Sequence, residues 1–213
     1  MSEDLSFVHR FEPGDGADTA SGVTLLLLHA TGGDENDLLP LGREISPGAA
    51  LLSPRGKTLE HGAPRFFRRL AEGVFDHEDL LMRTHELAGF VEAATERYGL
   101  DPAKLVAAGY SNGANIAASL TLLHPGLLRA AVLFRPMAPF EPEATPDLAG
   151  MPVFIAAGHR DQMIPPDNTE RLSEILREAG ADVDLRWRDI GHTLTYEEVT
   201  EAKEWLAEIL PTP

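Results

Sequence analysis

The sequence predicts an α/β protein in which helices pack on both faces of a mostly parallel central sheet. Two observations indicate this fold class. Short apolar runs alternate along the chain with longer segments of helical periodicity, which is typical of a parallel sheet covered by helices. The runs are apolar throughout instead of alternately apolar and polar, as expected of strands buried on both faces. No repeat or linker interrupts this order, so residues 1–213 are expected to form one domain without a large cap.

The strands are expected at the short apolar runs. Five of these should be buried, at residues 23–28, 49–52, 105–108, 130–134 and 153–157. The run 183–187 alternates in polarity and is therefore expected nearer a sheet edge. The run 7–11 is expected to add an antiparallel strand at the opposite edge.

The helices are expected between these strands. Residues 80–98 carry an apolar stripe at helical spacing and close at Gly99, a residue that favours the end of a helix. Residues 112–123 are rich in small side chains and stop before Pro125. Two further helices are expected at residues 169–179, before Gly180, and at residues 196–210, before Pro211.

The segment 53–76 departs from this alternation. Five basic and three acidic side chains give it a local charge of +2, and it carries Phe66 and Phe67 between arginines. Long irregular segments in compact domains are often binding loops or lids. The alternative is a surface excursion that the two phenylalanines anchor in the core. Arg65 and Arg68 are expected to be solvated, with binding of an anionic substrate group as the other interpretation.

Composition limits the classes of partner. The chain has 34 acidic and 18 basic residues, a net charge of −16, and only three of the basic residues are lysine. Such an acidic protein repels phosphate backbones and anionic lipids, so neither nucleic acid nor a membrane surface is an expected partner. The start Met-Ser-Glu-Asp is unlike a signal peptide, and a cytoplasmic location is expected. A homodimer is left open.

The strongest chemical signal is the G-x-S-x-G motif of residues 109–113, placed between a buried strand and a small-residue helix. A serine on such a tight turn adopts a strained backbone conformation, and the flanking glycines let neighbouring backbone pass close by. The following helix N-terminus favours negative charge near the serine. Ser111 is therefore the candidate nucleophile, with a turn serine as the alternative.

A serine nucleophile needs a base, and the base needs an acid that orients it. Asp161 follows the expected strand 153–157, and His192 follows the last expected strand. Because the carboxyl ends of parallel strands meet at one edge of a sheet, the three side chains are expected to converge. The alternatives are a capping Asp161 and a solvated His192, with Asp189 or Asp167 as rival acids and His159 as rival base.

The loop after the first buried strand, residues 28–34, contains Gly32 and Gly33. Glycines there allow backbone amides to turn toward an oxyanion. The amides of Thr31 and Asn112 are the candidate donors of this oxyanion hole. His29 is expected to hold the loop, with a role as base as the alternative.

These motifs together resemble the phospholipase/carboxylesterase family of α/β-hydrolases. The residues that carry the resemblance are 29–35, 65–69, 109–115, 158–161 and 191–192, and the branch most similar is the small prokaryotic carboxylesterases related to hydroquinone-resistance esterases. The resemblance implies an α/β-hydrolase fold, a Ser111–His192–Asp161 triad, and hydrolysis of carboxylic esters or thioesters without a cofactor. This chain departs from the family with His29-Ala30 for His-Gly and Ser111-Asn-Gly-Ala114 for Ser-Gln-Gly-Gly, which argues against depalmitoylation of proteins.

The expected function is that of a serine carboxylesterase acting on small acyl esters or thioesters, with a small-molecule substrate. Alternatives are a hydrolase-fold protein that binds a small ligand without turnover, and a transacylase or perhydrolase that uses the same triad. Eight histidines without clustered spacing and no cysteine argue against a metal site. The expected pocket walls are Phe66, Phe67, Met137, Phe140 and Leu194.

Overall fold

The computed structural model describes residues 5–15 and 22–210. The first four residues and Pro211, which the sequence analysis used for the start of the chain and the end of the last helix, lie outside the described residues. In the part of the chain that is described, no helix is both long and apolar enough to cross a membrane.

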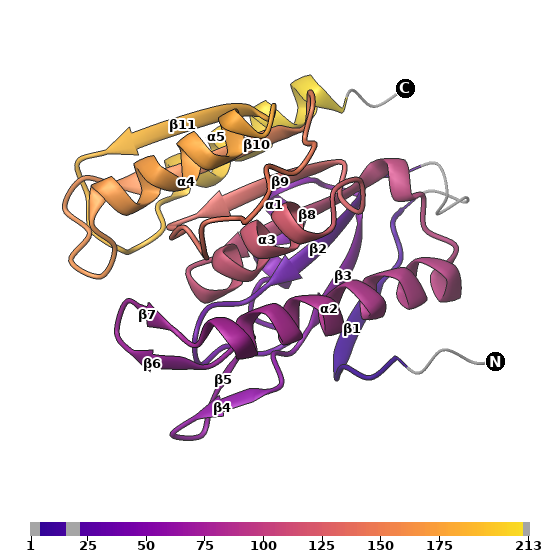
Figure 1. Cartoon of the computed structure of the whole chain (residues 1–213). Helices are drawn as coiled ribbons and strands as arrows, with labels where there is room; N and C mark the ends of the chain where they lie inside the picture. The colour runs from indigo at the N-terminus through magenta and orange to yellow at the C-terminus, as the bar shows by residue number, and fades with distance from the viewer. Residues whose placement is uncertain (1–4, 16–21, 211–213) are drawn as a thin grey trace.

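A seven-stranded sheet forms the centre of the molecule, in the order β1-β3-β2-β8-β9-β10-β11 (Figure 1). Its strands are β1 (His9–Glu12), β2 (Thr24–Leu28), β3 (Ala50–Pro54), β8 (Leu105–Tyr110), β9 (Ala130–Phe134), β10 (Pro152–Gly158) and β11 (Asp182–Arg188). All neighbouring pairs are parallel except β1 and β3, which are antiparallel. The expected α/β class is confirmed, as are the edge positions of the first and last strands.

Helices cover both faces of the sheet (Figure 1). They are α1 (Leu39–Ile45), α2 (His77–Tyr98), α3 (Asn112–Leu123), α4 (Pro166–Glu178) and α5 (Tyr196–Ile209), with a short 3₁₀ turn at Pro102–Lys104. The sequence analysis did not find α1, because seven residues with Pro40 in the first turn give too short a pattern. Helix α2 ends as expected at Gly99, whose φ of 64° lies in the left-handed region that glycine favours.

Two hydrophobic cores lie against the two faces of the sheet. Successive residues of β2 alternate between them: Leu26 and Leu28 pack in one core with α2, α3 and α4, whereas Leu25 and Leu27 pack in the other with α1 and α5. Because side chains of a strand point alternately to opposite faces, a strand buried on both sides must be apolar at every position. The continuous apolar runs in the sequence have this origin.

The segment 53–76 is not an irregular loop. After β3 it forms two short antiparallel hairpins, β4 (Thr58–Glu60) with β5 (Ala63–Arg65), and β6 (Arg69–Ala71) with β7 (Val74–Phe75). Phe66 and Phe67, between the hairpins, are 2% and 0% exposed and belong to the core of α2, α3 and α4. The two phenylalanines thus anchor the segment in the core as expected, and residues of its second hairpin also line a hollow beside Ser111.

The order of the strands fixes where a site can form. The chain moves outward from β2 to β3 and then returns past β2 to β8, so the sheet changes its winding direction between β2 and β8. In open parallel sheets, the loops that leave the carboxyl ends of two such strands diverge and leave a crevice between them. The loop with Thr31 follows β2, and Ser111 follows β8.

Candidate active site

Ser111 sits on the turn between β8 and α3 in a strained backbone conformation, with φ 54° and ψ −115°. The glycines of the motif make this turn possible. A Cβ atom added to Gly109 would lie 2.6 Å from the carbonyl carbon of Gly113, and one added to Gly113 would lie 1.9 Å from the carbonyl oxygen of Leu28. The expectation of a strained serine with closely passing backbone on either side is confirmed.

The structure brings Ser111, His192 and Asp161 into one hydrogen-bonded chain. The Ser111 Oγ lies 3.0 Å from His192 Nε2, and His192 Nδ1 lies 2.7 Å from Asp161 Oδ2. The other oxygen of Asp161 accepts the backbone N–H groups of Met163 at 2.9 Å and Ile164 at 3.1 Å. These two bonds fix the rotation of the carboxylate, so that Oδ2 faces the imidazole and selects the tautomer with a proton on Nδ1.

The rival acids and base lie elsewhere. Asp189 is exposed and pairs with Arg160 at 2.9 Å, and Asp167 is exposed in the first turn of α4. His159 is exposed and stacks on Trp187, with ring centroids 4.7 Å apart. None of the three contacts Ser111 or His192 through a hydrogen bond in the described residues.

The two residues expected to donate to an oxyanion, Thr31 and Asn112, lie beside Ser111. Asn112 is the first residue of α3, where N–H groups have no partner within the helix, and Thr31 lies on the loop after β2. Both residues line the same hollow as Ser111 and His192. Among the residues that the structure describes, neither N–H has a backbone partner outside the helices and strands. The pair is therefore available for a ligand.

The β4–β5 hairpin holds both candidate donors in place. Arg65, whose side chain is only 4% exposed, donates from Nη1 to Thr31 Oγ1 at 2.6 Å, and Gly32 N–H donates to the Pro64 carbonyl at 2.9 Å. The side chain of the other candidate residue, Asn112, accepts the Phe66 N–H at 2.8 Å. The expectation of a solvated Arg65 is wrong, because its guanidinium lies against the oxyanion loop, whereas Arg68 is 63% exposed as expected.

His29 supports this loop and does not face Ser111. Its Nδ1 donates to the Ala30 carbonyl at 2.7 Å, and its Nε2 accepts the Gly56 N–H at 2.9 Å. Burial lowers the pKa of His29, which keeps the ring neutral as these two bonds require. The expected structural role is confirmed. Ala30 takes the place of a glycine without strain, because it is not among the residues with positive φ.

Arg135 holds the loop that carries His192, and the sequence analysis missed it. Its side chain is 1% exposed and donates to the carbonyls of Gly191 at 3.1 Å and Thr193 at 2.8 Å, the residues on either side of His192. It also forms a two-point ion pair with Glu198 of α5, at 2.7 and 2.9 Å.

Glu198 remains charged in this buried setting. Burial opposes its ionisation, but hydrogen bonds from Arg135 and Thr195 outweigh that effect, and the pKa of Glu198 lies below its ordinary value. Glu198 also completes a capping box with Thr195 at the start of α5. The one signal for Arg135 in the sequence was a charged residue directly after a buried strand.

Tyr110, the residue directly before Ser111, also contacts the histidine. Its hydroxyl donates to the His192 carbonyl at 2.8 Å, and the two rings stack with centroids 5.6 Å apart. The His192 loop is thus held from β8 as well as from β9.

The hollow beside Ser111 has a volume of about 40 Å³. Of the expected pocket walls, Met137 lines it, and Phe140 lines a groove that adjoins it. Phe66, Phe67 and Leu194 do not line it; the phenylalanines lie in the core, and Leu194 packs against the core of α1 and α5. The sequence analysis did not find seven further lining residues, which are Arg69, Glu72, Gly73, Phe75, Asn115, Met163 and Ile164.

The described residues contain no cluster of three or more histidine, cysteine, aspartate or glutamate side chains arranged to hold a metal ion. The polar side chains that line the hollow are those of Ser111, His192, Thr31, Asn112, Asn115, Glu72 and arginines 65 and 69, both of which pair with Glu60.

Comparison with known proteins agrees with this fold. A family model described as the dienelactone hydrolase family matches residues 67–207. The putative hydrolase MhqD of Bacillus subtilis (strain 168) is 48% identical over 202 residues, which cover 95% of this chain and 98% of MhqD.

Two solved carboxylesterases are also similar. The Bacillus cereus carboxylesterase matches with a TM-score of 0.93 and 46% identity, over 98% of this chain and 97% of its own. The carboxylesterase of Mesorhizobium loti matches with a TM-score of 0.88 and 36% identity, over 96% of each chain. The resemblance to small prokaryotic carboxylesterases is thereby confirmed, as is the absence of a large cap, since these chains align over nearly their whole length.

Proposed function

Because the chain belongs to the dienelactone hydrolase family and is an enzyme that acts on esters, we propose that it is a serine carboxylesterase for small acyl esters or thioesters. In this proposal Ser111 is the nucleophile, His192 the general base and Asp161 the residue that orients the imidazole. The amides of Thr31 and Asn112 bind the oxyanion. The substrate is a small molecule, and no residue of the hollow is assigned to a cofactor.

The proposed reaction has two halves. His192 Nε2 removes the proton of Ser111, and Oγ attacks the ester carbonyl to give a tetrahedral intermediate whose oxyanion accepts the two amide N–H groups. His192 then protonates the leaving alcohol or thiol, and an acyl-enzyme remains on Ser111. Water attacks this acyl-enzyme by the same route and releases the acid. Loss of one oxyanion donor would cost roughly 3 kcal/mol of transition-state stabilisation.

The observation that carries the proposal is the hydrogen-bonded chain Ser111–His192–Asp161, with contacts of 3.0 and 2.7 Å. A serine is a weak nucleophile unless a base lies within hydrogen-bond reach and is itself held by a third group. Here the base is held at its carbonyl as well, by Tyr110. A protein that only binds a ligand needs no such arrangement of all three groups.

The test is hydrolysis of p-nitrophenyl esters from acetate to decanoate by the wild-type protein and by Ser111→Ala. We expect kcat/KM to fall by about 10³-fold or more in the variant, since removal of the nucleophile abolishes the acyl-enzyme route. Ser119→Ala is the matched control, because Ser119 lies in α3, the helix that follows Ser111, but bonds Thr84 in the core. An Ser111→Ala rate within twofold of wild type would refute the assignment.

Covalent labelling separates the remaining alternatives. A fluorophosphonate should label Ser111 of the wild-type protein and fail to label Ser111→Ala, because only an activated serine reacts readily. A ligand-binding protein without turnover would show no label. Transacylation or perhydrolysis would instead appear when an added alcohol or hydrogen peroxide competes with water for the acyl-enzyme.

A further inference from the structure

The hollow beside Ser111 is too small for a whole ester of ordinary size. Its volume is about 40 Å³, which holds only a few water-sized units. Phe75, Met137 and Ile164 are among its lining residues, as are arginines 65 and 69, which both pair with Glu60. The reacting carbonyl and a short group fit there, and any larger part of a substrate must leave the hollow.

A larger groove of about 340 Å³ begins where the hollow ends. The two share Gly73, Phe75 and Met137 in their walls, so they form one continuous surface. The groove runs between the β6–β7 hairpin and the loop after β9, toward the start of α4. Figure 1 shows the hairpin and the start of α4 at the same end of the molecule.

The loop wall of this groove is fixed in advance by hydrogen bonds from two helices. Asn115 of α3 accepts the Met137 N–H at 2.7 Å, and Asn168 of α4 accepts the Ala138 N–H at 2.8 Å. Thr169 donates to the Pro136 carbonyl at 3.0 Å. A wall held at three successive residues keeps its shape without a ligand, which favours selective binding.

The groove is suited to an uncharged group. Six apolar side chains line it, Val74, Phe75, Met137, Ala138, Pro139 and Phe140, together with the polar side chains of His77, Glu141, Asn168 and Arg171. The cation at its end, Arg171, is already neutralised by two bonds to Glu141 at 2.7 and 2.6 Å and by one to Glu174 at 3.1 Å. Val74 is 51% exposed, so the groove presents apolar surface that a ligand can cover.

We propose that this groove is a substrate subsite, and that the enzyme prefers asymmetric esters with one short group and one uncharged apolar or aromatic group. The short group stays in the hollow at Ser111, and the larger group lies in the groove past Met137. Its volume is at the lower end of small-molecule pockets, which suits a single ring or a short chain. The inference rests on the proposed role of Ser111.

The test compares two series of esters by pH-stat assay. One series varies the alcohol, with methyl, propyl and benzyl acetate, and the other varies the acid, with methyl acetate, methyl butanoate and methyl phenylacetate. Because burial of each methylene favours binding, we expect kcat/KM to rise at least tenfold along one series and to fall or stay level along the other. A similar rise along both series, or along neither, would overturn the proposal.

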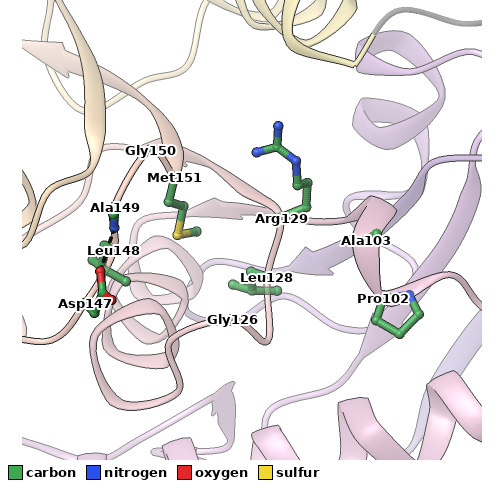
Figure 2. Close-up of a pocket in the computed structure, with 10 residues that line it drawn as sticks. All are labelled: Pro102, Ala103, Gly126, Leu128, Arg129, Asp147, Leu148, Ala149, Gly150 and Met151. Carbon is green, nitrogen blue, oxygen red and sulfur yellow. Dashed lines mark hydrogen bonds between the residues drawn. The ribbon is translucent and has the colours of Figure 1, made fainter.

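Two alanine-to-phenylalanine substitutions test whether the groove causes the preference for one ester series. Ala138→Phe fills the groove and keeps the backbone bond to Asn168, so kcat/KM should fall at least tenfold more for the preferred aromatic ester than for methyl acetate. The control is Ala149→Phe in a hollow of about 380 Å³ that lies before the amino ends of β8, β9 and β10. Figure 2 shows this hollow, with Leu128, Arg129 and Met151 around it. This variant should change neither rate.

A widened groove gives a second, independent readout. Phe140→Ala removes apolar surface from the wall of the groove, so KM should rise severalfold more for the preferred aromatic ester than for methyl acetate. Equal effects of Ala138→Phe on small and large esters, together with no effect of Phe140→Ala, would overturn the subsite. Failure of wild-type Ser111 to react with a fluorophosphonate would instead overturn the proposed function itself.

Discussion

Backbone constraints position the individual residues of the site, and only some of these constraints can be recognised in the sequence. Ser111 was found because the glycines that permit its strained turn are themselves part of the motif. Arg135 has a similar left-handed φ of 56°, yet its partners are the carbonyls of Gly191 and Thr193, which have no side-chain signature. Strained residues tend to cluster at functional sites, where the surrounding structure holds them, and these two directly follow the neighbouring strands β8 and β9.

A pair of glycine substitutions tests the close approach at the serine turn. In Gly113→Ala the new Cβ would lie 1.9 Å from the Leu28 carbonyl oxygen, so β2 and α3 must move apart. We expect the free energy of unfolding to fall by about 3 kcal/mol, at the upper end of the cost of overpacking.

The matched control is Gly89→Ala in the interior of α2, where an added Cβ meets no atom within 4 Å. Alanine has the higher helix propensity, so this variant should gain about 0.5–1 kcal/mol. Urea unfolding followed by circular dichroism measures both values. A Gly113→Ala protein as stable as Gly89→Ala would contradict the steric argument.

The short strands between β3 and α2 could not be predicted from the sequence. Strands of two or three residues, such as β6 and β7, are too short for any periodicity to appear. Their role nevertheless lies in specific contacts, since the β4–β5 hairpin supports Thr31 through Arg65 and the β6–β7 hairpin contributes Gly73 and Phe75 to the hollow. The basic side chains of this segment, for which anion binding was the alternative to solvation, all pair with carboxylates of the protein.

The loop after β11 gives a prediction at the same scale. Arg135 holds the carbonyls on both sides of His192 while it touches neither Ser111 Oγ nor the imidazole, so it is a positioning residue. In Arg135→Met, the loss of these bonds should lower kcat by about 10–100-fold with a smaller change in KM. A misplaced base slows the chemical step more than it weakens substrate binding. Arg135→Lys keeps the charge and should recover part of the loss.

The control for Arg135 is Arg188→Met. Arg188 pairs with Glu201 of the same helix α5 at 2.6 Å but is about one-third exposed and bonds no carbonyl of the His192 loop. Breaking a buried pair costs about 3–5 kcal/mol, so each rate is measured well below the Tm of its variant. If Arg135→Met and Arg188→Met had the same kcat, Arg135 would serve only stability.

For the whole molecule, hydrophobic patterning predicted which segments form strands but not their order in the sheet. The runs 23–28 and 105–108 are both apolar throughout, and nothing in either indicates that they are neighbours. Their pairing follows from the long return of the chain past β2, which only the complete packing decides. The site depends on that return, since it brings Thr31 beside Ser111.

The net charge of −16 predicts how the whole molecule responds to salt. If every lysine and arginine paired with one carboxylate, sixteen carboxylates would still lack a cationic partner. Their mutual repulsion opposes the compact state and acts over a Debye length of about 10 Å at 0.1 M salt, which shrinks to about 3 Å at 1 M. The surface ion pairs, in contrast, contribute only about 0–1 kcal/mol each, so their screening by salt costs little stability.

We therefore expect the Tm to rise by about 3 °C or more between 20 mM and 1 M potassium chloride, which corresponds to roughly 1 kcal/mol for a chain of this length. Chloride is chosen because sulfate would also strengthen apolar burial. A variant with Glu96, Glu170 and Glu204 all changed to glutamine, three exposed carboxylates without an ion pair in the described part of the chain, should have a higher Tm at low salt and a smaller rise. Such a response is typical of acidic proteins adapted to a salty cytoplasm. A Tm that stays level or falls with salt would mean that the surface ion pairs outweigh the repulsion between carboxylates. The acidity would then not be an adaptation to salt.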